Sequence, residues 1–560
     1  MKTRWWQDAI IYQVYLRSFQ DSNADGIGDL EGVRQRLDYL HDLGIDTIWI
    51  SPHYDSPMDD NGYDVRNFRQ VSPDYGTLDD FKALLRDAHA RGMKIIVDMV
   101  LNHTSDEHPW FVAAKDPAHP DHERYRDFYI WQPPKTDKDG NPGKPTRWIS
   151  WFGGSVWTFN EATQDYYLHI FSKKMPDLNW RNPAVRQAMK DVIRFWIDLG
   201  VDGFRIDASN HLEKNWDFPD ASPGYEHFSS LPKHHDYLEE LGKELFEPHD
   251  LLIIGEAGGA SREEALRYAG FESHAFNLLI QFEHCWADTD PTNTLTPGKW
   301  AKGPIDVQKI KHSFAKWQAV FEGRGWNVLY WHNHDQPRVV SHYGDDVNYH
   351  HRSALMLAYC LYLLPGTPIV YYGEEIGMTN VDYTNLEDFR DVEVFTEYRN
   401  FIRNGADHAT AMQALRDRSR DNARSPMQWS AEKHAGFSAV MPWMRANQNH
   451  ETINVENQRN NPTSILQTYR SLLTLRRDER LNHGHVTFYA LDHAQAFVYC
   501  VTGKTHDYLV VANFSGKPMR YVHRALCKSY DLFQSNLADV ETGSARFAPY
   551  EARIYRRQRQ

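Results

Sequence analysis

Short apolar runs rich in β-branched residues alternate along most of the chain with longer stretches in which apolar residues recur at helical spacing. Thr77 begins a capping-box pattern before a helix that Gly92 stops. Asn182 caps a second such helix, which Gly200 ends. Strand followed by helix, repeated, predicts an α/β fold with parallel pairing, a (β/α)8 barrel of the TIM type. Eight runs are the predicted strands: 10–15, 47–50, 94–100, 203–207, 251–256, 276–281, 327–331 and 368–372.

Three stretches depart from this alternation and predict the domain organisation. Residues 104–174 are rich in Pro, Gly, Trp and charge and are far too long for a strand-to-helix loop, which predicts a subdomain inserted after the third strand. Residues from 378 to about 456 predict a lid-like excursion after the eighth strand. From about 481 to 560 the pattern becomes one of alternating strands, which predicts a C-terminal antiparallel β-sandwich. The barrel would then comprise 1–103 and 175–480.

Length and composition narrow the classes of protein that this chain can be. At 560 residues it is too long for one compact domain, which agrees with a large barrel and smaller companions. The formal net charge of −14 argues against a nucleic-acid partner and favours a neutral small molecule. The chain has 18 Trp, 30 Tyr and 27 Phe, of which we expect about two-thirds in the core and the rest free to stack on sugar rings.

Cysteine spacing and the first residues predict where the protein works. The four cysteines show no CxxC spacing, which argues against a zinc site or a disulfide framework and favours reduced thiols. The start MKTRWWQDAIIYQVYLRSF lacks the features of a secretory signal, and no apolar run reaches membrane-spanning length. We expect a cytoplasmic protein without a membrane partner, and monomer and small homo-oligomer both stay open.

Four strand ends carry charged groups in one order along the chain: KIIVDMVLNH, DGFRIDASN, LLIIGEAG and NVLYWHNHDQ. A parallel barrel carries its chemistry where strands end and loops begin. If these runs are neighbouring strands, three carboxylates converge there, those of Asp207, Glu256 and Asp335. The sequence therefore predicts an active site at this end of the barrel.

The joint set of motifs resembles the α-amylase family, glycoside hydrolase family 13. The four segments above are preceded by GIDTIWISP and followed by GTPIVYYGEEIGM. DNGYD, MPDLNW and SRDNARSPMQW resemble the branch that contains oligo-1,6-glucosidases and α-glucosidases. The similarity runs nearly from end to end, and it implies hydrolysis of α-glucosidic bonds.

The resemblance implies a retaining mechanism with Asp207 as nucleophile, Glu256 as acid/base and Asp335 as a third carboxylate that grips sugar hydroxyls. Retention needs the first two roughly 5 Å apart. Arg205, two residues before the nucleophile on one strand, is expected to hold that carboxylate ionised. Glu256 follows the apolar run LLIIG, which is expected to raise its pKa.

The same resemblance implies the residues that hold the sugar. His103 and His334 are expected to donate to hydroxyls of the bound ring. Asp60 and Arg424 match a pair that closes the non-reducing end, so the site would be a pocket; a surface ion pair is the alternative. Tyr63, Phe152 and Phe171 match aromatic positions below and beside the glucose, although each could also be core.

The loop DSNADGIGD offers oxygen ligands at alternate positions, and Gly26 permits a sharp turn. By resemblance it binds a structural metal, usually calcium, and an Asx-rich turn without metal is the alternative. No organic cofactor is expected. The ligands would be Asp21, Asn23, Asp25, Asp29 and the carbonyl of Ile27.

We therefore expect a retaining, exo-acting α-glucosidase that releases α-glucose from small α-glucosides. Ala208 after the nucleophile resembles the α-1,4-preferring members and favours maltose-type substrates. Met175 and His332 depart from the family pattern and are expected at the rim of the acceptor site.

Three alternatives stay open. The first is an oligo-1,6-glucosidase acting on isomaltose-type linkages. The second is a transglycosylase or sucrose isomerase, which is disfavoured because KWQAVFEGRGWN shows no arginine-rich loop. The third is a non-enzymatic transporter heavy chain, which is disfavoured because the carboxylates are present and no membrane anchor is.

Overall fold

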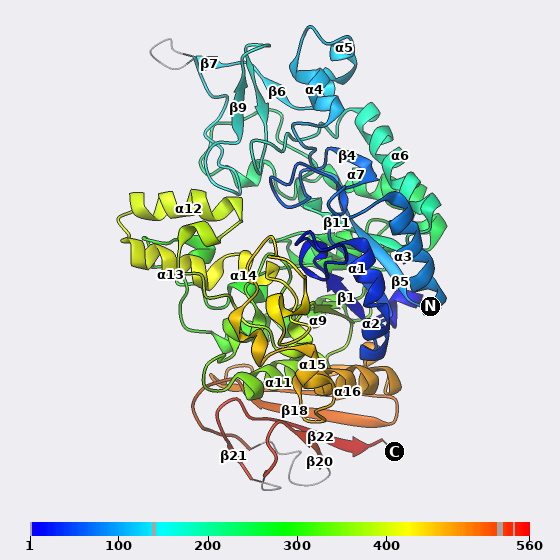
Figure 1. Ribbon diagram of the computed structural model, residues 1–560, viewed down its shortest axis with the longest axis vertical. Helices are drawn as coiled ribbons and strands as arrows, with labels where there is room; N and C mark the ends of the chain where they lie inside the picture. The colour runs from blue at the N-terminus through cyan, green and yellow to red at the C-terminus, as the bar shows by residue number, and fades with distance from the viewer. Residues whose placement is uncertain (1–2, 137–141, 523–529, 541–543, 560) are drawn as a thin grey trace.

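The computed structural model describes residues 3–136, 142–522, 530–540 and 544–559 (Figure 1). Eight parallel strands form its centre, in the order β13-β12-β11-β5-β2-β1-β15-β14. β1 pairs with both β2 and β15, so the first strand joins the last ones and the sheet curls into a nearly closed barrel. The eight predicted strands are confirmed as β1 (Ile11–Val14), β2 (Thr47–Ile50), β5 (Lys94–Val100), β11 (Gly203–Asp207), β12 (Leu252–Glu256), β13 (Leu278–Ile280), β14 (Val328–Leu329) and β15 (Thr367–Tyr371).

Helices surround the barrel, and the two predicted helix boundaries are confirmed. Thr77 and the side chain of Asp80 form a reciprocal capping box. Asn182 accepts from the second N–H of its helix, and Gly200 ends that helix with φ +99°. The helices around the barrel are α1 (Leu30–Gln35), α2 (Leu37–Leu43), α3 (Leu78–Ala90), α6 (Pro183–Leu199), α7 (His234–Leu241), α8 (Arg262–Ala269), α9 (Val307–Phe321), α10 (Val339–Tyr343), α11 (His350–Leu361) and α16 (Ile465–Asp478).

Alternate residues of each strand point to opposite sides of the barrel wall. One core cluster fills the barrel interior, with Ile11, Trp49, Ile96 and Ile254 among its members. Their chain neighbours belong to the cluster between strands and helices. Asp98 and Glu256 come two residues after Ile96 and Ile254 on the same strands, so their side chains also point inward. They lie nearer the carboxyl end of the barrel.

The inserted subdomain lies above the barrel in Figure 1, in cyan, and contains α4 (Pro109–Lys115), α5 (His122–Tyr125) and an antiparallel sheet of β6 (Trp131–Gln132), β10 (Asp165–Leu168) and β9 (Trp157–Asn160). Its small core contains Trp148, Trp157 and Phe228. Phe228 comes from the segment after β11, so that segment packs with the subdomain.

The excursion after β15 contains α12 (Val392–Arg403), α13 (His408–Arg418), α14 (Asp421–Arg424) and α15 (Val455–Arg459), with α12 and α13 at the left of Figure 1. A separate cluster joins α12 and α13 to Trp300, which lies in the loop that follows β13. The excursion is therefore attached to that loop as well as to the end of β15.

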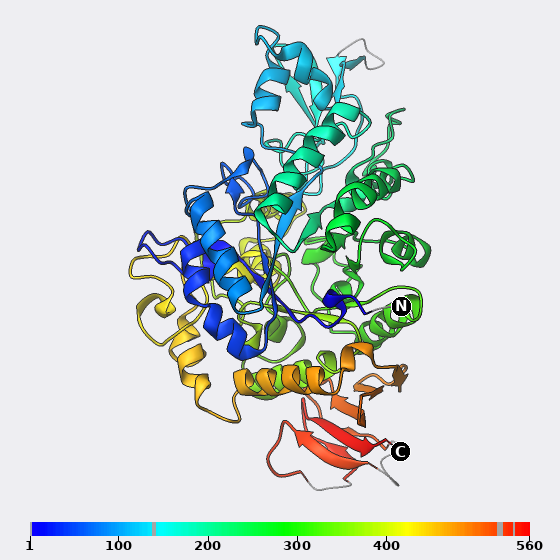
Figure 2. The same cartoon turned by 90° about the vertical axis from the view of Figure 1, so that its right-hand side faces the viewer.

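The predicted C-terminal β-sandwich is confirmed, and its larger sheet lies at the bottom of Figure 2 in orange and red. A two-stranded ribbon, β19 (Met519–Arg520) and β21 (Arg546–Phe547), covers one face of that sheet. The other face packs on α11. The larger sheet is antiparallel, in the order β16 (Val486–Tyr489), β17 (Ala496–Thr502), β18 (His506–Asn513), β22 (Ala552–Gln558) and β20 (Asp531–Ser535).

Cys285, Cys360 and Cys500 are free thiols, and Cys527 lies outside the described residues. No helix in the described part of the chain has the length and apolar character needed to span a membrane.

Candidate active site

A cavity of about 650 Å³ opens at the carboxyl ends of the barrel strands. Arg205 and Arg424 do not line it and lie fully buried behind its wall. The predicted residues that do line it are Asp60, Tyr63, His103, Phe152, Phe171, Asp207, Ala208, Glu256, His334 and Asp335. The structure thus brings together residues from strand ends, from the inserted subdomain and from loops that are far apart in the sequence.

The three predicted catalytic carboxylates face this cavity. Asp207 ends β11 and Glu256 ends β12, on the neighbouring strand and with the same inward direction. The side chains of Asp207, Glu256 and Asp335 are 14%, 18% and 26% exposed, although the backbone around them is buried. That remaining exposure is toward the cavity, where a ligand can reach the carboxylate oxygens.

Arg205 joins two of these carboxylates below the cavity floor. Its Nη1 lies 2.7 Å from Asp207 Oδ1 and 2.6 Å from Asp98 Oδ1, and its Nη2 makes an ion pair with Glu256. Asp98 is opposite Arg205 in the register of β5 and β11, and Trp49 holds its second oxygen at 2.8 Å. The guanidinium therefore fixes Asp207 and Glu256 relative to each other.

Burial and the Arg205 guanidinium act in opposite directions on the pKa of Asp207. Burial raises the pKa of Asp207 to about 6, because desolvation outweighs the attraction of Arg205 and the Asp98 carboxylate adds repulsion. Arg205 contacts Asp207 as expected and lowers its pKa, and at about 6 the carboxyl is still ionised at neutral pH. Glu256 follows its apolar strand as expected, and its carboxylate also contacts the same guanidinium. The expected rise in the pKa of Glu256 stays a prediction.

Asp335 has the opposite environment. Burial raises its pKa, but the neighbouring positive charges outweigh burial and hold the pKa of this carboxyl well below its usual range: those of Arg420 and Arg424, and that of His334 when its ring is protonated in acid. Asp335 is therefore an anion at any physiological pH.

The two predicted histidines line the cavity as neutral rings. Burial lowers the pKa of both His103 and His334 to about 3. His334 Nε2 is 2.8 Å from the Tyr63 hydroxyl, and the two rings are stacked with centroids 5.4 Å apart. Phe171 packs edge-on against His103, and Phe152 packs on Phe171. The aromatic predictions thus fall on one wall of the cavity.

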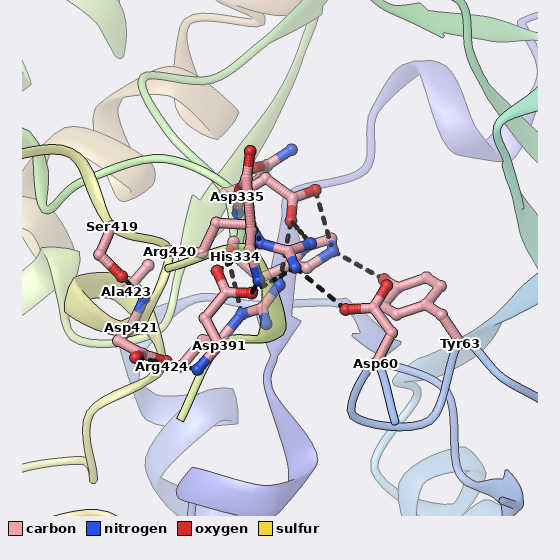
Figure 3. Close-up of polar contacts among 12 residues, drawn as sticks. Asp60, Tyr63, His334, Asp335, Asp391, Ser419, Arg420, Asp421, Ala423 and Arg424 are labelled. Atoms are coloured by element: carbon pink, nitrogen blue, oxygen red, sulfur yellow. Dashed lines mark hydrogen bonds and ion pairs between the residues drawn. The ribbon is translucent and has the colours of Figure 1, made fainter. Parts of the chain in front are cut away.

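The structure corrects the predicted pair of Asp60 with Arg424 (Figure 3). Asp60 Oδ1 accepts from Arg420 Nη2 at 3.0 Å. Arg424 instead donates to Asp335 Oδ1 at 3.1 Å and to the carbonyl of His334 at 3.1 Å. The two arginines are one helical turn apart in the segment SRDNARSP, and only Arg420 reaches the cavity, with its guanidinium over the Phe152 ring.

Sequence reasoning also missed the residues that hold Arg420 in place. Asp391, fully buried, accepts from Arg420 Nε at 2.8 Å and Nη2 at 2.7 Å, a bidentate pair. Asp391 also caps α12 by accepting from the Glu393 N–H at 3.1 Å. Lys299 and Glu393 form a further ion pair at 2.5 Å and line the cavity. No spacing in the sequence indicates these contacts, because they join irregular segments.

The two departures from the family pattern lie in different places. Met175 lines the cavity, and its place at the acceptor rim stays a prediction. His332 does not, because it is fully buried behind the strand with Nδ1 3.2 Å from Glu374 Oε2. The prediction that His332 lies at the acceptor rim is therefore wrong.

The loop predicted to bind calcium is held by hydrogen bonds within itself. Asp21 accepts from three backbone N–H groups of the loop at 2.8–3.0 Å, and Asp29 caps α1. Asn23 and Asp25 each accept from the N–H two residues on, the last at Ile27, as in Asx turns. Among the described residues, no three His, Cys, Asp or Glu side chains gather closely enough to hold a metal. Calcium at these five positions stays a prediction.

The family is shown by comparison with known proteins. A family model of the α-amylase catalytic domain matches residues 13–484, which is more than half of the chain. The chain therefore belongs to the α-amylase family and is a glycoside hydrolase.

The relatives indicate the branch within the family. The chain is 43% identical to an oligo-1,6-glucosidase of Halalkalibacterium halodurans over 99% of both chains. It is 44% identical to an α-glucosidase of Pediococcus pentosaceus over 84% of this chain and 85% of the relative. The crystal structure of an isomaltulose synthase from Klebsiella sp. LX3 superposes with a TM-score of 0.93 at 34% identity, covering both chains fully. These similarities agree with the branch that contains oligo-1,6-glucosidases and α-glucosidases.

Proposed function

We propose that the protein is a retaining, exo-acting α-glucosidase that releases α-glucose from the non-reducing end of short α-glucosides. The observation that carries the proposal is the contact of Asp207 and Glu256 with one guanidinium, that of Arg205. Two carboxylates that contact neighbouring nitrogens of one guanidinium are close to each other, which supports the roughly 5 Å separation of retaining enzymes over the ~6.5–9.5 Å of inverting ones.

In this mechanism Glu256 gives its proton to the glycosidic oxygen while Asp207 Oδ attacks the anomeric carbon, so the aglycone leaves as an alcohol and a glucosyl ester forms. Glu256 then removes a proton from water, which attacks the ester and releases glucose with the α configuration. Asp335, held as an anion, grips hydroxyls of the same ring. Arg205 positions both reacting carboxylates without touching the sugar.

Exo action is supported by the closed end of the cavity. The Asp60–Arg420 pair lies at that end, beside Asp335. Both side chains are almost completely buried, so the pair is no loose surface contact. A sugar chain cannot continue past this pair, and only a terminal glucose fits.

Linkage preference is proposed as α-1,4, because Ala208 lines the cavity directly after the nucleophile. The second candidate is isomaltose-type hydrolysis, which the names of the relatives favour. Equal concentrations of maltose, isomaltose, sucrose and trehalose are expected to give glucose fastest from maltose, and NMR of fresh product should show the α anomer. Faster release from isomaltose would overturn the α-1,4 preference, and β-glucose would overturn retention.

The sucrose arm of this experiment tests the third candidate, a sucrose isomerase, which the likeness to isomaltulose synthase favours. An isomerase returns a rearranged disaccharide, whereas a hydrolase returns equal amounts of glucose and fructose. We expect hydrolysis products only, because the segment 316–327 carries no arginine-rich loop.

The acid limb of activity should follow Asp207. Its raised pKa of about 6 means that the carboxylate is ionised at neutral pH and protonated in mild acid. Since only the ionised form can attack, kcat/KM for maltose is expected to fall about tenfold per pH unit below about pH 6. The check is a pH profile of kcat/KM, with residual activity measured at neutral pH to exclude unfolding. An acid limb at the ordinary carboxyl pKa of about 4 would contradict the effect of burial.

A further inference from the structure

We propose that the acceptor side of the cavity rejects anionic aglycones, such as phosphorylated or carboxylated ones, and takes neutral or cationic ones. Glu397 of helix α12 repels the anion, and Glu393 of the same helix keeps Lys299 paired and so unavailable to it. This inference rests on the α-glucosidase function proposed above and defines the chemical class of its substrates.

The described residues that line the cavity carry an unequal balance of charge. The two basic ones are Lys299 and Arg420. The six acidic ones are Asp60, Asp207, Glu256, Asp335, Glu393 and Glu397.

Neither basic side chain is available to an anionic ligand. Lys299 pairs with Glu393 at 2.5 Å. Arg420 makes its bidentate pair with Asp391 and also contacts Asp60 at 3.0 Å. A phosphate or carboxylate in the cavity would therefore have to break one of these pairs or stay without a cation.

Glu397 belongs to the open end of the cavity, whereas Glu393, one turn earlier on the same helix, is buried, pairs with Lys299 and lies 3.7 Å from Arg420 Nε. The Asp60–Arg420 pair closes the glucose end, so the aglycone must extend the other way. Two exposed tryptophans mark the open end, Trp151 of the inserted subdomain at 40% and Trp286 after β13 at 39%.

Two neighbours, Tyr225 and Gly153, show that Glu397 lies at the open end of the cavity. Tyr225 stacks on Trp151 with ring centroids 4.2 Å apart, and the pKa of Tyr225 is raised by burial and by the charge of Glu397. A Cβ on Gly153 would lie 3.2 Å from Glu397 Oε1. Helix α12 therefore meets the inserted subdomain where the aglycone leaves.

Glu397 makes no ion pair within 4 Å in the part of the chain that the structure describes; its contact is a hydrogen bond from Asn400 at 3.2 Å, and Lys299 acts on it only as a more distant charge. Glu397 is half-buried, and burial and the neighbouring Glu393 raise its pKa. At the effective dielectric of a partly buried site, one such carboxylate disfavours a neighbouring anion by about tenfold.

Aryl α-glucosides that differ in one para substituent test the inference: a neutral carboxamide, a carboxylate and an aminomethyl cation. We expect kcat/KM of the parent protein for the carboxylate to be about tenfold below that for the carboxamide. In Glu397→Gln the carboxylate-to-carboxamide ratio should rise several-fold. Differences in leaving-group chemistry cancel when the ratios of parent and variant are compared.

Glu393→Gln gives an independent variant, because it removes a charge and also frees Lys299 to face the ligand. Its carboxylate-to-carboxamide ratio should rise further than that of Glu397→Gln. The matched control is Glu272→Gln, an exposed acid outside the cavity, which should leave the ratio unchanged. Salt at about 0.5 M should screen the repulsion and bring the carboxylate-to-carboxamide ratio of kcat/KM of the parent closer to one.

Equal kcat/KM for carboxylate and carboxamide in the parent, or a ratio that neither variant changes, would overturn the inference. Titration calorimetry with Asp207→Asn measures the affinities for the three glucosides without turnover. We expect the carboxylate to bind more weakly than the carboxamide and the aminomethyl cation. If the carboxamide binds but the parent does not hydrolyse it, the proposed function fails while the binding order still tests the charge selection.

Discussion

Replacing Asp207 by asparagine is expected to lower kcat for maltose by roughly 10⁴-fold, as loss of a covalent nucleophile does in other hydrolases. The amide has the shape of the carboxylate but cannot form the glucosyl ester. Arg205 keeps its pairs with Asp98 and Glu256, so the floor of the cavity should stay in place. Initial rates with maltose at high enzyme concentration measure the loss.

The same variant is expected to unfold at a temperature no lower than that of the parent. A carboxyl whose pKa is raised to about 6 by folding binds its proton more tightly in the native state than in the unfolded chain. Its ionisation therefore costs stability as pH rises through that value, and the uncharged amide avoids this cost. Retention of more than about a hundredth of the parent kcat, with deamidation excluded by mass spectrometry, would refute Asp207 as nucleophile.

The fold could be predicted because its determinants are local. Each strand is a short β-rich run, and the caps at Thr77 and Asn182 depend on residues within one helical turn. The common direction of Arg205 and Asp207 could be predicted in the same way, because they are two residues apart on one strand; the pairing of Arg205 with Asp98 of β5 is seen only in the structure. The three candidate catalytic carboxylates could be picked out because Asp207 and Glu256 end apolar strands, and Asp335 lies six residues after β14.

The ion pairs around the glucose end could not be predicted in the same way. Arg420 and Asp60 are 360 positions apart, and both lie in loops without periodic sequence. Arg420 and Arg424 are equally good candidates on the chain, and the direction of the short helix α14 decides which of them reaches Asp60.

The pKa of Asp207 could not be predicted from neighbouring residues in the sequence either. The sequence shows that Arg205 is near Asp207, but the size of the opposing desolvation depends on the whole cavity wall. The contact of Arg205 with Glu256 likewise comes from the pairing of β11 with β12. Proximity can therefore be inferred from strand position, whereas the balance between burial and attraction cannot.

Arg420→Gln is expected to destabilise the protein by about 3–5 kcal/mol and to lower kcat/KM for maltose by roughly 10²-fold. Asp391 is fully buried and makes both its charge-assisted hydrogen bonds to Arg420, so the substitution leaves this carboxylate without its cation. Asp60 loses its partner at the glucose end as well. Urea unfolding followed by tryptophan fluorescence gives the first quantity, and initial rates give the second. Arg403→Gln, at the exposed end of α12, is the matched control.

Adding Asp391→Asn to Arg420→Gln separates the structural role of the pair from its role at the sugar. Asparagine still caps α12, and the double variant no longer buries an unpaired charge at this position, so much of the lost stability should return. Activity should not return, because Asp60 still faces the glucose without Arg420. If Arg420→Gln unfolds at the urea concentration of the parent, the buried pair does not hold this end of the cavity; if the double variant regains activity, Arg420 acts on stability alone.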